Sequence, residues 1–252
     1  MTAMFANSFD AVDAVLRDYI KLQQKRTGPN LERMGEVIEG WMSAKALSEA
    51  DNTQFGTLFN PFALASLKET LHSKILGELL NPRGSHGQGP LFLRCLLKHL
   101  KVPEPDAGEW QHAVEEDRVD LMLARAKPAS VILIENKANN AVDQPNQLYR
   151  YWHRQIHCRF PPLDYQCPET RRYFRVIYLS ADGRKMPEPH SLKRPNGWEG
   201  INRDHATLPL TWEPLGLDKL LGLLHDEAST RVPETNARLR IFIQMYSELW
   251  NL

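Results

Sequence analysis

The sequence has few of the features that would place it outside the cell or in a membrane. Its 252 residues include only three cysteines, too few and too scattered for the disulfide framework of a secreted domain. No apolar run approaches the roughly 18 residues of a membrane span. Residues 1–10 lack the basic and apolar regions of a signal peptide. We therefore expect a cytoplasmic protein without membrane association.

Several nucleotide-binding and catalytic signatures are missing as well. The glycine-rich segment 83–90 does not fit the spacing of a P-loop, and no G-x-G-x-x-G occurs. Lys+Arg and Asp+Glu are both 31, so the net charge indicates no partner. The distribution of charge says more, because residues 137–203 hold 12 basic and 6 acidic side chains. This excess suits a phosphate backbone, although solvated arginine-rich loops are equally common.

What the sequence does contain is a strand–turn–strand pattern over residues 114–137. Val119, Leu121 and Leu123 alternate with more polar positions, as in a half-buried strand. Lys127-Pro128 ends that strand. Residues 131–134 form a continuous apolar run, which predicts a second strand buried on both faces.

The second strand ends in Glu135-Asn136-Lys137. Side chains two positions apart on a strand share a face, so Glu135 and Lys137 point together while Asn136 turns away. With Asp120 on the neighbouring strand, two carboxylates and one lysine would converge. Such carboxylates can hold Mg²⁺, and the lysine can act on a water or a phosphate during metal-assisted hydrolysis. The alternative is a Glu–Lys pair that caps a buried strand, because E-x-K alone is weak evidence.

A helix is predicted over residues 60–80, with apolar residues on two faces. One face carries Glu69, His72 and Ser73 at helical spacing. Since such a helix is buried on both sides, Glu69 should be partly enclosed and should need a partner or a metal. Two interpretations stand, a third acidic metal ligand or a structural hydrogen-bonding group, and Glu78 is the alternative ligand on the same helix. A core role is the more common one for a histidine such as His72.

Weaker patterns assign the remaining segments. Apolar residues at helical spacing predict an N-terminal helical hairpin, a helix before the strands and two C-terminal helices, over residues 8–26, 31–47, 91–101, 215–227 and 232–252. Further strands are predicted at residues 110–114, 172–179 and 208–212. Residues 183–206 are rich in Pro, Gly, Lys and Arg, and predict a long exposed loop that contacts DNA or gates the substrate.

A helix after Lys137 places Gln147 and Tyr151 one turn apart, with Arg150 and Arg154 beside them. A zinc site in this region is a competing interpretation. The potential ligands are His153, His157, Cys158 and Cys167. Their spacing does not match the paired ligands of a folded zinc module.

Together these motifs resemble the PD-(D/E)xK nuclease superfamily, in particular a bacterial family within it. The resemblance covers about residues 62–151. It rests on five motifs, which read here Glu69-x-x-His72-Ser73-x-Ile75-Leu76-x-x-Leu79-Leu80, His86-Gly87, Arg118-Val119-Asp120, Ile134-Glu135-Asn136-Lys137 and Asp143-Gln144-x-x-Gln147-Leu148-x-x-Tyr151. One departure is Val119, where the superfamily name expects proline; that proline is frequently absent.

The resemblance implies an α/β fold with an αβββαβ core, in which a mixed central sheet is flanked by helices. It also implies a Mg²⁺- or Mn²⁺-dependent nuclease. Residues 61–252 would form the nuclease domain with its C-terminal helices, and residues 1–60 an N-terminal helical appendage. Asp120 and Glu135 would bind the metal, with Glu69 completing the site.

Further roles follow from the same resemblance. Lys137 would position the water or stabilise the transition state, and Gln147 would lie against the active site with support from Tyr151. The side chains predicted to bind nucleic acid are His72, Ser73, Arg150, Tyr151 and Arg154.

Two functions remain open at this point. The first is a metal-dependent nuclease that acts on DNA, as an effector of anti-phage defence or restriction. The second is a catalytically weak nuclease-like fold that serves as a nucleic-acid-binding or assembly module. Because an unrestrained nuclease would harm its host, the first also predicts a homodimer or a regulatory partner.

Overall fold

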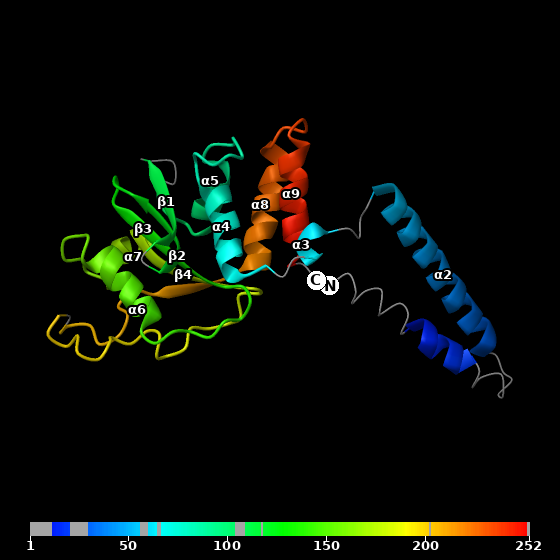
Figure 1. Ribbon diagram of the computed structural model, residues 1–252, viewed down its shortest axis with the longest axis horizontal. Coiled ribbons are helices and arrows are strands. Elements are labelled where there is room, and N and C mark those ends of the chain that lie inside the picture. The colour runs from blue at the N-terminus through cyan, green and yellow to red at the C-terminus, as the bar shows by residue number, and fades with distance from the viewer. Residues whose placement is uncertain are drawn as a thin grey trace. The chain divides into compact units, whose positions relative to one another are not determined.

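The computed structural model describes residues 12–20, 30–55, 60–64, 67–103, 109–116, 118–201 and 203–250. The chain divides into two compact units, residues 1–66 and 67–252 (Figure 1).

The first unit contains a helix over residues 12–20, helix α2 (Asn30–Phe55) and the short helix α3 (Pro61–Leu64). Lys45 of α2 forms an ion pair with Asp13 of the first helix at 3.7 Å, so two helices of the predicted hairpin are in contact. Residues 8–11 and 21–26 of the predicted first helix lie outside the described residues. Helix α2 extends past the predicted end at Leu47. The prediction stopped there because residues 48–55 are mostly polar and show no apolar period.

The second unit is built on a five-stranded sheet in the order β1-β2-β3-β4-β5. The strands are β1 (Trp110–Glu116), β2 (Val119–Arg125), β3 (Ser130–Lys137), β4 (Phe174–Ser180) and β5 (Trp212–Gly216). The first three are antiparallel, and β3, β4 and β5 run parallel. The turn at residues 126–129 separates β2 from β3, as Lys127-Pro128 predicts.

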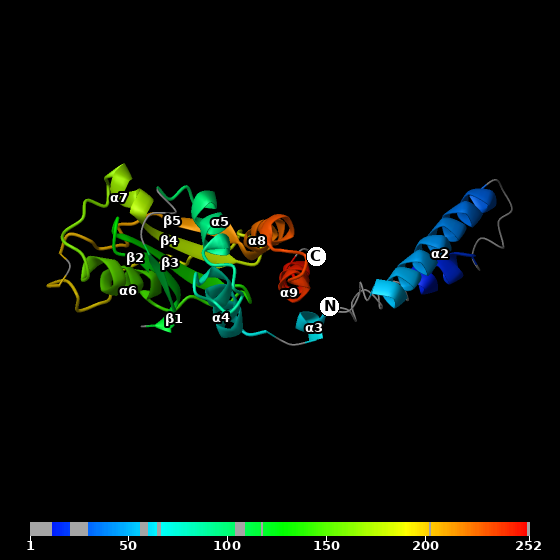
Figure 2. The same ribbon diagram turned by 90° about the horizontal axis from the view of Figure 1, so that it is seen from above.

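Helices lie on both sides of this sheet (Figure 2). Helix α4 (Glu69–Leu80) packs on β1, β2 and β3, α5 (Leu91–His99) lies against α8 (Leu217–Arg231), and α9 (Ala237–Glu248) packs on α8. Helix α6 (Gln147–Trp152), its π-helical continuation η1 (His153–His157) and α7 (Pro168–Tyr173) belong to the other side. The predicted α/β fold with a mixed sheet flanked by helices is confirmed.

The two faces of the sheet carry different cores. Toward α6, Val131 and Leu133 of β3 pack with Trp152 in one buried apolar cluster. Toward α4, the approach is so close that a Cβ on Gly77 would lie 2.3 Å from Val114 and 3.6 Å from Leu121. Because neighbouring positions on a strand face opposite ways, β3 serves both cores, and all its residues are buried.

Two further predicted elements differ from the structure. The helix expected over residues 60–80 is interrupted: α3 ends at Leu64, and Lys68 is extended before α4 begins at Glu69. The strand predicted at residues 208–212 is wrong apart from Trp212. Leu208 instead donates its N–H to Leu192 of the long loop at 2.8 Å. Strand β5 follows it and contains Pro214, a residue tolerated at a sheet edge but read in a sequence as a strand breaker.

The long loop is largely as predicted, with no helix or strand among described residues of the segment 181–211 and one isolated bridge from Lys193 to Thr207. Among the described helices, none is both long and apolar enough to cross a bilayer.

Candidate active site

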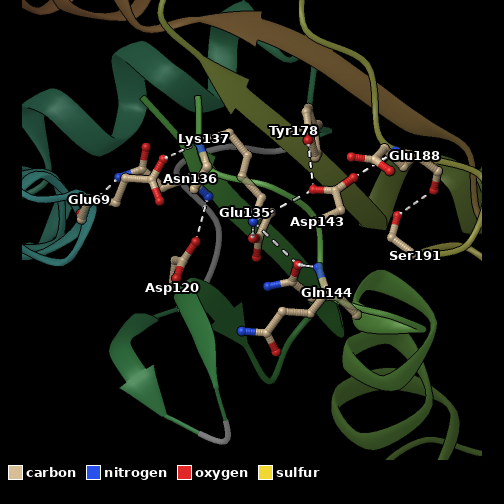
Figure 3. Close-up of polar contacts among 12 residues, drawn as sticks. Glu69, Asp120, Glu135, Asn136, Lys137, Asp143, Gln144, Tyr178, Glu188 and Ser191 are labelled. Atoms are coloured by element: carbon tan, nitrogen blue, oxygen red, sulfur yellow. Dashed lines mark hydrogen bonds and ion pairs between the residues drawn. The ribbon is translucent and has the colours of Figure 1, made fainter. Parts of the chain in front are cut away.

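Strand register brings the two predicted carboxylates together. Leu121 of β2 lies opposite Ile134 of β3 in an antiparallel pair, so Asp120 and Glu135 follow as the next positions across the two strands. Asp120 Oδ2 accepts the backbone N–H of Asn136 at 2.6 Å. Figure 3 shows Asp120 and Glu135 at the ends of their strands, with Asn136 between Glu135 and Glu69.

Burial dominates the electrostatics of these carboxyl groups. It raises the pKa of Asp120 to about 6. Burial, reinforced by the charge of Asp120, raises the pKa of Glu135 to about 8. Glu135 Oε2 is buried and accepts no hydrogen bond from the residues that the structure describes. Two carboxylates that ionise reluctantly, one with an unpartnered oxygen, are a site where a cation would be strongly stabilising.

Lys137 lies on the same face of β3 as Glu135, as the period of a strand predicts. Its Nζ is 2.7 Å from Glu135 Oε1 and 3.6 Å from Asp143 Oδ1. It also donates to Gln147 Oε1 at 3.3 Å. Burial lowers the pKa of this amine, but the neighbouring carboxylates outweigh burial and leave the pKa above its ordinary value. The ammonium is therefore a fixed positive charge inside the site.

Helix α6 supplies the second half of this arrangement. Gln147 Oε1 accepts the Lys137 ammonium and the backbone N–H of Gln144 at 3.1 Å, while its Nε2 donates to the Tyr151 hydroxyl at 2.8 Å. Burial and the charge of Glu135 raise the pKa of Tyr151, so its hydroxyl stays protonated. Asp120, Glu135, Lys137, Gln147 and Tyr151 thus form one connected group.

Glu69 does not join the two carboxylates. Its Oε1 accepts the backbone N–H groups of Asn139 and Ala141, at 3.1 and 3.3 Å, and so supports the turn after β3. The alternative, Glu78, accepts the N–H of Ser85. In the described ranges, no set of three or more His, Cys, Asp or Glu side chains is placed to hold a metal ion. The site therefore offers two carboxylates from the sheet, with Glu69 beside it.

His72 and Ser73 are each only 1% exposed, which leaves no surface for the nucleic-acid contact predicted for them. His72 Nδ1 is 2.7 Å from the Tyr246 hydroxyl and its ring stacks on that tyrosine. Burial lowers the pKa of His72 to about 4. Ser73 Oγ donates to Glu69 O and accepts from Asn136 Nδ2, both at 3.0 Å. Both side chains instead connect α4 to its neighbours, because the α4 face that they share is covered by α9 and β3.

The other side chains predicted to bind nucleic acid are placed differently. Tyr151 is 3% exposed and engaged by Gln147. Arg150 is half-buried and Arg154 is exposed, so these two side chains reach solvent. The zinc interpretation gains no support: Cys158 Sγ lies 3.4 Å from His153, but among the described residues no group of three or more His, Cys, Asp or Glu side chains that could hold a metal includes them.

Two residues with clear contacts had no role assigned from the sequence. Asn136 turns away from Glu135 and bonds to α4 through Ser73 and Glu69 O. Asp143 is 4% exposed and lies on the far side of the Lys137 ammonium. Its place at the start of the D-Q-x-x-Q motif indicates that Asp143 could have a role. The hydrophobic period of the sequence does not predict how the loop between β3 and α6 orients its side chain.

Comparison with known proteins identifies a family for most of the chain. A model of the family described as "PD-(D/E)XK nuclease superfamily" matches residues 59–244. Searches of the curated proteins and of the solved structures returned no match. With an α/β core that carries Asp120, Glu135 and Lys137 at adjoining strand ends, the chain belongs to the PD-(D/E)XK nuclease superfamily.

Proposed function

We propose that this protein is a cytoplasmic, Mg²⁺- or Mn²⁺-dependent nuclease that hydrolyses phosphodiester bonds in DNA. The observation that carries the proposal is the buried pair of carboxylates on β2 and β3, in which Glu135 Oε2 has no hydrogen-bond partner among the described residues and Lys137 lies 2.7 Å from Oε1. A lysine beside two carboxylates suits phosphoryl chemistry better than strand capping.

Asp120 and Glu135 would hold the divalent cation. Mg²⁺ is commonly held by one or two carboxylates, with water and phosphate oxygens in its remaining positions, so two protein ligands are sufficient. When bound, the cation would neutralise charge on the scissile phosphate and lower the pKa of a coordinated water. Glu69, predicted as a third ligand, is assigned here to the turn at residues 138–141.

Lys137 would act at the phosphate. Its ammonium would stabilise negative charge that develops on the non-bridging oxygens or orient the attacking water. Gln147 would fix the direction of the lysine side chain, because one amide oxygen accepts the ammonium while the amide nitrogen is tied to Tyr151. Asp120 and Glu135 would therefore bind the metal, and Lys137 would stabilise charge at the phosphate. Gln147 and Tyr151 would hold the lysine in place.

The substrate surface would include Arg150 and Arg154, which reach solvent from the helix that carries Gln147 and Tyr151 and from its π-helical continuation. Charge neutralisation of phosphates by arginine favours any nucleic acid, and DNA is preferred on the superfamily resemblance. The same resemblance suggests a role in anti-phage defence or restriction, with a partner subunit or a change of oligomeric state that restrains activity.

Cleavage assays test the proposal directly. Plasmid DNA, single-stranded DNA and RNA are incubated with the protein in Mg²⁺, Mn²⁺ or EDTA. We expect metal-dependent cleavage of DNA that is lost in Asp120→Ala and Lys137→Ala and retained in Glu199→Gln, a control at an exposed carboxylate. Cleavage that persists unchanged in Lys137→Ala would contradict the mechanism. Tight DNA binding without cleavage in any metal would favour the binding-module alternative.

A further inference from the structure

Asp143 is a buried acidic residue to which the proposed nuclease mechanism assigns no role. It is not placed as a metal ligand, because the Lys137 ammonium lies between it and Glu135, 3.6 Å from Asp143 Oδ1 and 2.7 Å from Glu135 Oε1. A carboxylate that is 4% exposed needs compensation from a cation and hydrogen bonds. Lys137 is the cation that the structure places beside it.

The carboxylate of Asp143 is held independently of the lysine. Its Oδ1 accepts the Tyr178 hydroxyl at 2.8 Å, and its Oδ2 accepts the backbone N–H of Glu188 at 2.6 Å. Tyr178 comes from β4 and Glu188 from the long loop, so two elements fix this anion (Figure 3). A fixed anion is what a lysine needs in order to be positioned, since its four-carbon stem is flexible.

The Asp143 carboxylate would matter most for Lys137 when a metal ion is bound. If Glu135 held a divalent cation, its carboxylate would compensate the Lys137 ammonium less fully than it does in the metal-free ion pair. Gln147 then offers a neutral contact at 3.3 Å, which does not balance the lysine charge. Asp143 is the second carboxylate beside the ammonium, with its Oδ1 3.6 Å from Lys137 Nζ.

Asp143 also joins the long loop to the site. Besides the bond from Glu188, His190 Nε2 lies 3.1 Å from the Asp143 carbonyl oxygen. Two carbonyl groups of the loop accept hydrogen bonds from α6 and from the residue before it. Asn146 N–H donates to His190 O at 2.9 Å, and Tyr149 N–H donates to Ser191 O at 3.2 Å. Residues 188–191 are thus bound to the segment that carries Asp143 and Gln147.

We propose that Asp143 is a positioning residue for Lys137, and that the same carboxylate fastens residues 188–191 of the long loop to the active site. This inference rests on the proposed nuclease function for its kinetic consequence. Through Asp143, the long loop would be connected to Lys137, because Glu188 and the lysine contact the same carboxylate.

The test is Asp143→Asn, which keeps the size of the side chain and removes its charge. Because a misplaced reacting group costs on the order of 10²-fold in rate, we expect kcat for plasmid cleavage to fall about 100-fold. KM and the Mg²⁺ concentration for half-maximal rate should stay within about threefold of wild type, because the proposal assigns Asp143 to Lys137 and not to the substrate or the cation. Asp182→Asn, at an exposed carboxylate of the same loop, is the matched control and should cleave normally.

Two readouts do not depend on cleavage. Labelling of Lys137 by an amine reagent in Mg²⁺ buffer, followed by mass spectrometry, should be faster in Asp143→Asn than in Asp182→Asn. Amide hydrogen exchange over residues 188–191 should also accelerate in Asp143→Asn. If the wild type cleaves nothing, the proposed function fails, while these two readouts still test the positioning role.

An unchanged kcat in folded Asp143→Asn, or unchanged Lys137 labelling, would overturn the inference. If that variant does not fold, Tyr178→Phe provides the second test, because it removes one bond to Asp143 and leaves the charge in place. We expect kcat to fall about 3- to 10-fold, the scale of one hydrogen bond, without a change in KM. An unchanged kcat in Tyr178→Phe would then count against the assignment.

Discussion

The two faces of β3 end in polar groups of opposite character. On the α4 face, Asn136 donates through Nδ2 to Glu69 O and Ser73 Oγ, and its Oδ1 accepts the N–H of Ala138, each at 3.0 Å. On the α6 face, Glu135 keeps a buried oxygen without a hydrogen bond among the described residues. Complete hydrogen bonding is the mark of a structural network, and a specific unpaired group invites a functional explanation.

Adjacent residues of one strand can therefore have separate roles. Asn136, whose side chain is fully hydrogen-bonded, should contribute to stability, and Glu135, which keeps an unpaired oxygen among the described residues, should contribute to activity. Substitutions on the α4 face should lower stability more than activity, and substitutions on the α6 face should do the reverse.

The largest effect is expected for Asp120→Asn, on β2 across from Glu135. Loss of a charged group that stabilises a transition state costs about 10²- to 10³-fold, and we expect cleavage to fall by at least about 10³-fold because the cation loses a ligand as well. Stability should not fall, since burial raises the pKa of Asp120 to about 6 and the neutral amide removes that penalty. Steady-state cleavage and urea unfolding without metal measure both quantities. A large fall in the free energy of unfolding of Asp120→Asn would contradict the proposal that this carboxylate serves activity and not stability.

The converse is expected for Asn136→Ala. It removes three hydrogen bonds and leaves partners buried, which should lower the free energy of unfolding by about 2–3 kcal/mol. Urea denaturation measures the loss, with Asn196→Ala, at an exposed turn position, as control. Below the unfolding transition, the variant should retain Mg²⁺ binding. A stability equal to that of the control would show that the α4 face is not the structural one.

A smaller effect is expected for Gln147→Ala. This substitution removes the neutral support of Lys137 and frees Tyr151, but leaves Asp143 in place. Supporting residues of this kind typically contribute 10- to 100-fold, so we expect cleavage to fall by about 10-fold or more with unchanged Mg²⁺ dependence. Tyr151→Phe should cost less, because it removes the hydrogen bond from Gln147 to the hydroxyl but leaves the Gln147–Lys137 contact in place. A larger loss for Tyr151→Phe than for Gln147→Ala would reverse the proposed order of support.

The smallest effect concerns pH. Burial raises the pKa of Glu135 from 4.5 to about 8, so between these values the folded metal-free protein holds a proton that the unfolded chain has released. The contribution of this carboxyl to metal-free stability therefore falls as pH rises through that window. A cation binds only the ionised carboxylates, so its stabilising effect should grow over the same range. We expect the Mg²⁺-induced increase in Tm to be larger at pH 8 than at pH 6, and to vanish in Asp120→Asn.

The site was predictable from sequence where strand geometry governs it. A period of two places Glu135 and Lys137 on one face, and a turn at Lys127-Pro128 brings β2 beside β3. Helical spacing was less informative: it put Glu69, His72 and Ser73 on one face of α4, but it could not tell that α9 and β3 cover that face. Asp143 was missed because its partners come from β4 and from a loop without a repeating pattern.

Pro214 bears on how copies of this protein could associate. It lies exposed in β5, the last strand of the sheet order. Sheet edges recruit strands of other chains through their free N–H and C=O groups, and proline has no N–H to offer. A dimer built by continuing the sheet through β5 would lack a bond at the middle of the new ladder. Association of two copies through the β5 edge of the sheet should therefore be disfavoured.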